Sequence, residues 1–335
     1  MSEPDQTPPL LDVQQLGKLY RVGGWLRPKH LRALHDASFT LGHREILALV
    51  GESGSGKSTI ARLCVRLEAP TSGRILLDGR DVLHEERAHA TLAYRRRVQM
   101  IFQDPFGSLN PARTIGQHLE RPLLLHDKAK TRADLSARVH ALLDTVGLVP
   151  ASEVAAKYPQ ELSGGQRQRV AIARALAVEP DLILADEPVS MLDVSIRADV
   201  LNLMLDLKEK RGISFLYITH DLASARYVAD RMMVMYAGHI VEAGPSDALL
   251  EKPLHPYTKL LLSAVPDLEG SFARELPARS GAPALVDPPP GCPFAARCPD
   301  VTDVCRRETP RPVSLDERRV VRCHLYPEPS RTRSE

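Results

Sequence analysis

The sequence of 335 residues lacks any apolar run close to the eighteen or so residues that a membrane-spanning helix needs. It also lacks any large net charge, because 44 Lys and Arg residues against 42 Asp and Glu residues leave only +2. The first absence excludes a chain that itself forms helical membrane spans. The second removes any global indication of a nucleic-acid or polyanion surface. Aromatic residues are scarce at 4%, against 43% hydrophobic residues overall, a balance typical of a soluble α/β protein.

The N-terminal residues 1–9 are polar and proline-rich, with no basic segment followed by an apolar one. This composition gives no indication of a secretory signal, and we expect a disordered tail. Residues 10–51 read as short β segments separated by Gly23-Gly24 and Gly42. After Gly244-Pro245 the composition changes to a proline-rich segment with clustered cysteines, where we place a boundary.

Three apolar runs predict buried strands, at Ile46–Val50, Leu182–Ala185 and Ser214–Thr219. They lack period-two alternation, as strands do when helices cover both faces, so we expect a mostly parallel sheet. Between Pro111 and Val178 the apolar spacing becomes helical, with one helix ending at Gly147. The sequence therefore predicts an α/β fold with an inserted helical lobe.

A phosphate-binding loop follows the first of these strands. Its glycines allow backbone N–H groups to turn toward a polyphosphate, and the helix that begins near Lys57 adds its positive dipole end. Lys57 is expected to reach the β- and γ-phosphates, and Ser58 to hold Mg²⁺ with Thr59 assisting. The predicted nucleotide-binding residues are Gly51, Glu52, Ser53, Gly54, Ser55, Gly56, Lys57, Ser58 and Thr59.

Two carboxylates, Asp186 and Glu187, end the second strand, at the sheet edge where parallel sheets bind ligands. Asp186 suits an outer-sphere partner of Mg²⁺, while Glu187 can polarise the water that attacks the γ-phosphate. A second anion-binding helix start is predicted at Ser163, Gly164, Gly165 and Gln166, which follow Leu162 and precede a helix expected over Arg167–Ala177. Taken alone, Ser163 is as well explained as a helix N-cap.

In this order the motifs closely resemble those of the ATP-binding-cassette (ABC) ATPases, over about Leu10 to Gly244. The resemblance implies a P-loop NTPase fold: a RecA-like parallel sheet core, an antiparallel β subdomain and an inserted α-helical subdomain at about 106–178. It implies an ATPase domain at 10–250 and a C-terminal extension at 251–335. It further implies that the phosphate loop of one cassette is completed by the Ser163–Gln166 equivalent of a second, identical or paralogous, so that ATP joins a head-to-tail pair.

Four single residues also match the family pattern. Gln103 resembles the glutamine that touches Mg²⁺ or the attacking water and moves with the helical lobe, and His220 resembles the histidine that contacts the γ-phosphate and orients Glu187. Tyr20 is similar to the aromatic that stacks on adenine. Asp193 matches the acidic residue at the interface between cassettes, although Met191 stands where the family more commonly has a small alanine.

The C-terminal part resembles the extension of the oligopeptide/dipeptide/nickel importer ATPases, through 255–262, 291–299 and 322–325, and residues 102–111 resemble the same subfamily. The implied function is ATP-driven uptake of peptides or related solutes, delivered by an extracytoplasmic binding protein to two membrane permease subunits. The implied location is the cytoplasmic face of the membrane, with no nucleic-acid partner. The sequence leaves open an importer of oligosaccharides or nickel, an exporter, and a soluble cassette ATPase acting on nucleic acid or ribosomes.

Four cysteines near the C-terminus have spacings unlike the paired pattern of structural zinc sites. A disulfide is not expected in a cytosolic ATPase. Free thiols, zinc and a 4Fe–4S cluster stay open on count and spacing, and the resemblance adds weight to the cluster. The candidate ligands are Cys292, Cys298, Cys305 and Cys323.

Overall fold

The computed structural model describes residues 8–24, 29–86, 89–263, 285–316 and 318–326. Most of the tail predicted to be disordered therefore lies outside the described residues, as do 264–284 and 327–335 of the predicted extension. We use the term C-terminal segment for the described residues after 250.

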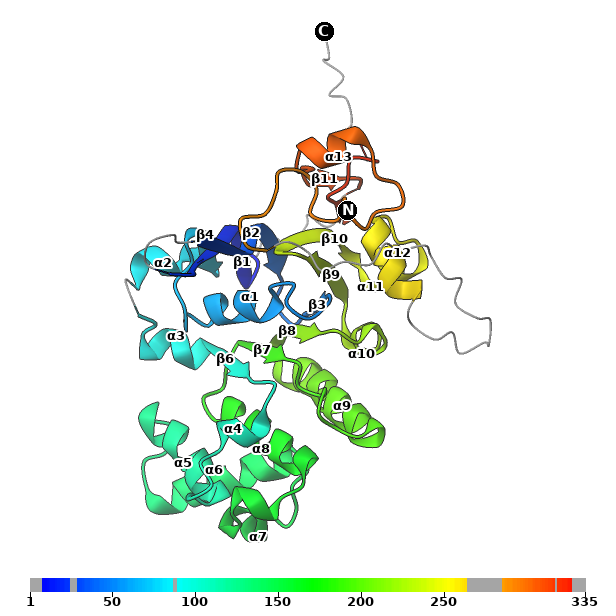
Figure 1. Ribbon diagram of the computed structural model, residues 1–335. Helices are drawn as coiled ribbons and strands as arrows, with labels where there is room; N and C mark the ends of the chain where they lie inside the picture. The colour runs from blue at the N-terminus through cyan, green and yellow to red at the C-terminus, as the bar shows by residue number, and fades with distance from the viewer. Residues whose placement is uncertain (1–7, 25–28, 87–88, 264–284, 317, 327–335) are drawn as a thin grey trace, which may run out of the picture.

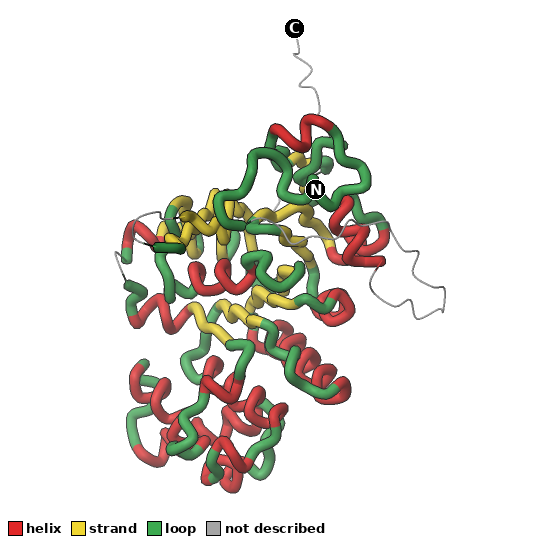
Figure 2. Tube along the Cα trace, viewed as in Figure 1, coloured by secondary structure: helices red, strands yellow, loops and turns green. Residues whose placement is uncertain are grey.

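An eight-stranded sheet forms the centre of the molecule (Figures 1 and 2). Its order is β11-β12-β10-β9-β3-β8-β7-β6, and the five strands from β9 to β6 are parallel, as the unbroken apolar runs predict. The strands β10, β12 and β11 continue it in antiparallel fashion, so the C-terminal segment extends the central sheet. The strand bounds are β3 Ile46–Val50, β6 Val98–Ile101, β7 Leu182–Asp186, β8 Ser214–Thr219, β9 Arg231–Tyr236, β10 His239–Pro245, β11 Val313–Ser314 and β12 Val320–Val321.

A second, antiparallel sheet has the order β2-β1-β4-β5, with β1 Leu11–Val22, β2 Lys29–Leu41, β4 Ser72–Leu77 and β5 Arg80–Asp81. The prediction of short β segments was wrong here, because β1 and β2 are 12 and 13 residues long. Register shifts within β1, near Gln15 at φ 50°, absorb the irregularity without ending the strand. Helix α1 (Lys57–Cys64) packs its apolar side chains into a core shared with both sheets.

The helices α4 to α8 form a separate lobe below the central sheet in Figure 1, which we call the helical lobe. Helix α6 ends as predicted, with Gly147 at φ 71° just beyond it. Helix α8 begins at Gly164, three residues earlier than expected, because Ser163 and Gln166 close a capping box over its first turn. The bounds are α4 Pro105–Ser108, α5 Ile115–Leu125, α6 Arg132–Thr145, α7 Ala151–Ala156, the 3₁₀ turn η1 Pro159–Glu161 and α8 Gly164–Leu176.

Helices α9 and α10 lie on the β7 and β8 side of the central sheet, in one continuous apolar core with the helical lobe. Helix α2 lies beside β4 of the second sheet, and α13 lies in the C-terminal segment at the top of Figure 1. No helix in the described part of the chain has the length and apolar character to cross a membrane. The bounds are α2 Val82–Glu85, α3 Leu92–Arg97, α9 Val194–Arg211, α10 Leu222–Val228, α11 Ser246–Glu251, α12 Pro256–Ser263 and α13 Asp303–Arg307.

Candidate functional site

The phosphate loop runs from the buried strand β3 directly into α1. Gly56 ends it at φ 108°, and a Cβ there would lie 2.5 Å from the Ala33 carbonyl oxygen. At Gly51 a Cβ would lie 2.2 Å from the Met235 carbonyl oxygen. Glycine is therefore required at both positions, by steric contact at each and by backbone conformation at Gly56, and the loop can present its N–H groups ahead of the helix.

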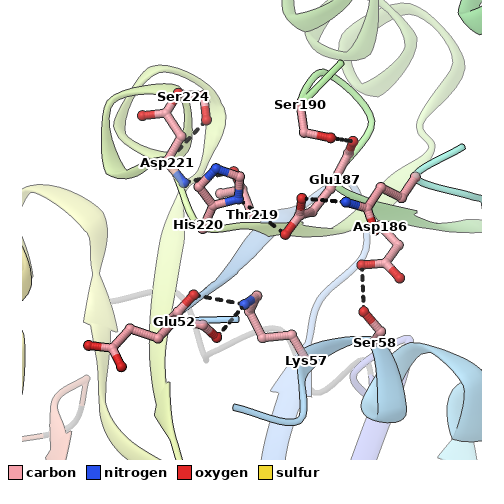
Figure 3. A network of polar contacts seen from close by, with 12 residues as sticks. Glu52, Lys57, Ser58, Asp186, Glu187, Ser190, Thr219, His220, Asp221 and Ser224 are labelled. Atoms are coloured by element: carbon pink, nitrogen blue, oxygen red, sulfur yellow. Dashed lines mark hydrogen bonds and ion pairs between the residues drawn. The ribbon is translucent and has the colours of Figure 1, made fainter. Parts of the chain in front are cut away.

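Lys57 is the first residue of α1, and its side chain turns back into the loop. Its Nζ donates to the Gly51 carbonyl at 2.7 Å and to the Glu52 carbonyl at 2.9 Å (Figure 3). Burial lowers the pKa of Lys57, while the charges of Glu187, Asp186 and Glu52 act to raise it. The ammonium is thus held beside the loop amides, where phosphates would sit.

Ser58 and Asp186 provide the oxygen atoms suited to a magnesium ion. The Ser58 hydroxyl donates to Asp186 Oδ1 at 3.1 Å, and Asp186 is only 5% exposed. Burial raises the pKa of Asp186, the Ser58 hydrogen bond opposes that rise, and nearby Glu187 adds to it. Hard oxygen ligands of this kind fit Mg²⁺, and a bound cation would also favour the ionised carboxylate.

Glu187 is the point on which the predicted catalytic residues converge, at the ends of three adjacent strands. Gln103, after β6, donates from Nε2 to Glu187 Oε2 at 2.9 Å. His220, after β8, places Nδ1 3.1 Å from Glu187 Oε1 (Figure 3). The carboxylate is therefore oriented by two side chains and stands next to Asp186, as a general base for a water would need to be.

The backbone at Glu187 is also constrained. Its φ is 46°, its N–H donates to the Ile218 carbonyl at 2.9 Å, and its carbonyl accepts from the Ser190 hydroxyl at 3.0 Å. A glutamate in the left-handed region costs free energy, so the surrounding hydrogen bonds fix a conformation that the residue would not otherwise choose. Sequence reasoning missed Ser190 in this role, because no sequence pattern reports a positive φ at a glutamate.

The predicted second phosphate-facing segment starts α8 in the helical lobe. The Ser163 side chain accepts from the Gln166 N–H at 3.3 Å, and Gln166 Oε1 accepts from the Ser163 N–H at 3.0 Å, so both side chains cap their own helix. A Cβ on Gly165 would lie 2.4 Å from Ile196 of α9, which explains a glycine there. The N-cap interpretation is confirmed for Ser163, and an anion-binding role stays a prediction.

Asp193 is the N-cap residue of α9, and two apolar side chains near it in sequence are exposed. Met191 is 57% exposed and Val194 is 82% exposed. The predicted role of Asp193 at an interface between cassettes stays a prediction.

Tyr20 lies on β1, and its hydroxyl donates to Glu68. The Lys18 ammonium stands 4.9 Å from the centroid of its ring. Burial raises the pKa of Tyr20, and the Glu68 contact adds to that effect. The geometry thus gives Tyr20 local partners, and its predicted stacking on adenine stays a prediction.

The four cysteines of the C-terminal segment do not support the predicted 4Fe–4S cluster. Among the residues that the structure describes, no three Cys, His, Asp or Glu side chains form a group that could hold a metal ion. Cys292 and Cys298 pack against the apolar core, and the Cys305 Sγ lies 3.2 Å from the Thr302 hydroxyl. Burial raises the pKa of Cys292 to about 12 and that of Cys298 to about 11, which favours neutral thiols. As placed, these side chains do not fit a cluster.

Comparison with known proteins agrees with the geometry. A family profile described as "ABC transporter" matches residues 34–190, and one described as "Oligopeptide/dipeptide transporter, C-terminal region" matches residues 241–305. The "Probable peptide ABC transporter ATP-binding protein y4tS" of Sinorhizobium fredii is 47% identical, over 94% of this chain and 90% of its own. The "Dipeptide transport ATP-binding protein DppF" of Haemophilus influenzae is 42% identical, over 96% and 98% respectively.

A solved structure supplies the same fold. The "Dimeric structure of a post-hydrolysis state of the ATP-binding cassette MJ0796 bound to ADP and Pi" is 29% identical, with a TM-score of 0.61, and covers 70% of this chain and 98% of its own. The α/β cassette fold predicted from the sequence is thereby confirmed. The chain belongs to the ABC-type ATPases, as an ATP-binding subunit of the oligopeptide/dipeptide transporter family.

Proposed function

We propose that this chain hydrolyses ATP as one of two head-to-tail cassettes and powers uptake of peptides or related solutes through two separate membrane subunits. The observation that carries the hydrolytic part is the convergence of Gln103 and His220 on Glu187, beside Ser58 and Asp186. The importer part is supported by the likeness to peptide-transport subunits over nearly the whole chain, residues 241–305 included.

In this proposal Glu187 accepts a proton from the water that attacks the γ-phosphorus, while the bond from that phosphorus to the bridging oxygen of ADP breaks. Lys57 and the loop amides stabilise the charge that spreads over the phosphate oxygens. Mg²⁺, held near Ser58, Asp186 and Gln103, would neutralise phosphate charge. His220 keeps the Glu187 carboxylate aimed, and no covalent enzyme intermediate is needed.

The partner cassette, identical or paralogous, would contribute its own Ser163–Gln166 segment to each phosphate loop. The exposed Met191 and Val194 support such a contact, because a chain acting alone would leave both side chains in water. The dimeric MJ0796 cassette offers a structural precedent. Closing the pair around ATP and reopening it after hydrolysis would be the source of mechanical work.

We place the contact with the membrane subunits in a groove of about 550 Å³ between the central sheet and the helical lobe. Apolar side chains line it, with Leu67 60% exposed, Leu125 52% exposed and Phe102 40% exposed. Arg95, Arg113, Arg121 and Arg174 also line it. The groove suits an amphipathic cytoplasmic segment with acidic residues, which would pair with these arginines. Because Phe102 adjoins Gln103 in the chain, a displacement of Phe102 by that segment would also displace Gln103 in the catalytic site. The subunit would thus lie at the cytoplasmic face of the membrane.

Substitution of Leu125 by Asp tests this groove. We expect Leu125→Asp to reduce the recovery of membrane subunits with the tagged chain, because it puts a charge on apolar contact surface, while ATP affinity stays unchanged. Leu315→Asp, at a residue 43% exposed in the C-terminal segment, is the matched control and should keep full recovery. Equal recovery with Leu125→Asp and the control would contradict the groove as the docking site.

Purification of the tagged chain from detergent-solubilised membranes tests the function itself. We expect recovery with two hydrophobic membrane subunits, and ATP turnover that an external solute-binding protein stimulates. In sealed vesicles, peptides should be taken up in preference to oligosaccharides or nickel. Recovery only with ribosomes or DNA would contradict the transport function, and turnover indifferent to every binding protein would contradict import.

A further inference from the structure

The second residue of the phosphate loop, Glu52, is held by the C-terminal segment through two independent contacts. Its backbone N–H donates to the Tyr257 hydroxyl of α12 at 3.0 Å. Its carboxylate accepts a hydrogen bond from each terminal nitrogen of Arg297. Nη1 donates to Oε2 at 3.0 Å, and Nη2 donates to Oε1 at 3.1 Å. These contacts join parts of the chain 205 and 245 residues apart in sequence.

The same residue also contacts Lys57. The Glu52 carbonyl accepts from Lys57 Nζ at 2.9 Å and from the Ser55 N–H at 3.2 Å. The backbone of Glu52 therefore links Tyr257 on one side to the phosphate-binding lysine on the other. The peptide whose N–H contacts Tyr257 joins Gly51 to Glu52, and its own carbonyl, that of Gly51, accepts from Lys57 Nζ at 2.7 Å. A displacement of this peptide would therefore shift a carbonyl that helps to place the Lys57 ammonium.

The two anchoring side chains are themselves rigidly packed. Tyr257 is fully buried, with its ring centroid 4.5 Å from that of Tyr236 and 5.5 Å from that of Phe294. The Arg297 guanidinium lies 5.7 Å from the Tyr236 ring centroid and 5.9 Å from that of Phe294. Tyr236 ends β9, next to Met235, whose carbonyl oxygen occupies the space that a Cβ on Gly51 would need. The aromatic cluster thus fixes both anchors relative to the start of the loop.

A carboxylate in a phosphate loop needs a partner, because negative charge there opposes the negative charge of ATP. Figure 3 shows the Glu52 side chain directed away from Lys57. The bidentate pair with Arg297 holds it in that direction and neutralises it, in the fork geometry that arginine and carboxylate favour. Without Arg297 the carboxylate would be uncompensated and free to turn toward the phosphates.

We propose that Tyr257 and Arg297 are positioning residues for nucleotide binding, through which the C-terminal segment sets the backbone and the charge of the phosphate loop at Glu52. Neither residue needs to touch ATP. The C-terminal segment thereby acts on the ATP site from outside it, through these two contacts alone.

The charge part is tested by ATP affinity of the full-length chain, measured by equilibrium binding. Arg297→Ala should weaken ATP binding about two- to tenfold, because the Glu52 carboxylate, 40% exposed and screened in part by water, then opposes the charge of ATP. The double variant Glu52→Gln/Arg297→Ala should recover most of that loss, because the repelling charge is gone. Glu52→Gln alone leaves the Arg297 cation unpaired and should bind ATP at least as tightly as the unaltered chain does. A double variant as weak as Arg297→Ala would overturn the charge argument.

The backbone part is tested by Tyr257→Phe, which keeps the ring and its packing and removes only the acceptor of the Glu52 N–H. The KM for ATP should rise about two- to tenfold, the factor that one hydrogen bond contributes, with kcat little changed. An unchanged KM would overturn this part.

A matched control separates positioning of the phosphate loop from a general effect on how the C-terminal segment packs against the rest of the protein. Arg322 makes a similar bidentate pair with Asp36 of β2, at 2.8 and 3.2 Å, away from the phosphate loop. Arg322→Ala should lower the melting temperature to an extent comparable with Arg297→Ala, and leave ATP affinity unchanged. If Arg322→Ala weakened ATP binding as much as Arg297→Ala, the contact at Glu52 would have no specific role.

Discussion

Glu187→Gln is expected to abolish steady-state ATP turnover while leaving ATP binding intact. Glutamine has the same shape and can keep hydrogen bonds to Gln103 and His220, but it cannot accept the proton of the attacking water. The loss of a general base corresponds to a rate decrease of about 10²- to 10⁴-fold. Phosphate release measures the turnover, and gel filtration with ATP should show the paired form accumulating.

The control for this variant is Glu209→Gln, at a residue of α9 whose side chain is 65% exposed. It should hydrolyse ATP at the rate of the unaltered chain. Retained turnover in Glu187→Gln would mean that another group accepts the proton. It would contradict the assignment of Glu187 as the general base.

Lys57→Ala is expected to act earlier, on nucleotide binding itself. The ammonium is the one side-chain charge that α1 directs into the phosphate loop among the described residues, and its loss also removes a donor from the Gly51 and Glu52 carbonyls. A charged hydrogen bond of this kind contributes about 1.5–3 kcal/mol, so ATP affinity should fall about 10- to 100-fold. Equilibrium titration with ATP measures the effect.

Lys210→Ala provides the comparison, because Lys210 is 71% exposed on α9 and pairs only with Asp206 in the described structure. Its ATP affinity should match that of the unaltered chain. A Lys57→Ala variant that binds ATP normally yet fails to hydrolyse it would contradict the binding role and reassign Lys57 to the chemical step.

The sequence allowed the core of the site to be predicted because its strands and motifs are local. The strands β3 and β8 follow from unbroken apolar runs, and the place of Glu187 follows from the end of β7. Parallel pairing then brings Gln103 and His220 to the same sheet edge. To predict the contacts of Gln103 and His220 with Glu187, only the strand order must be known, and the family resemblance supplied it.

Long-range and conformational features could not be predicted in the same way. The pairing of Arg297 with Glu52 depends on how the C-terminal segment folds back over β9 and β10, and no periodicity reports such a contact. The lengths of β1 and β2 depend on bulges that turn signals do not reveal. The cysteine spacing shows how many thiols are available but not how they are arranged in space. Among the described residues, these side chains do not form a group that could hold a metal cluster.

The central claim is that each ATP is enclosed by two cassettes, with the phosphate loop of one facing Ser163–Gln166 of the other. The most direct test is an experimental structure of the complete membrane complex carrying Glu187→Gln, with ATP and Mg²⁺ bound. We expect each nucleotide between the two chains, with its γ-phosphate near Lys57 of one and Ser163 of the other. Nucleotide enclosed by one chain alone, with its own or the second chain's Ser163–Gln166 segment facing solvent, would contradict the account.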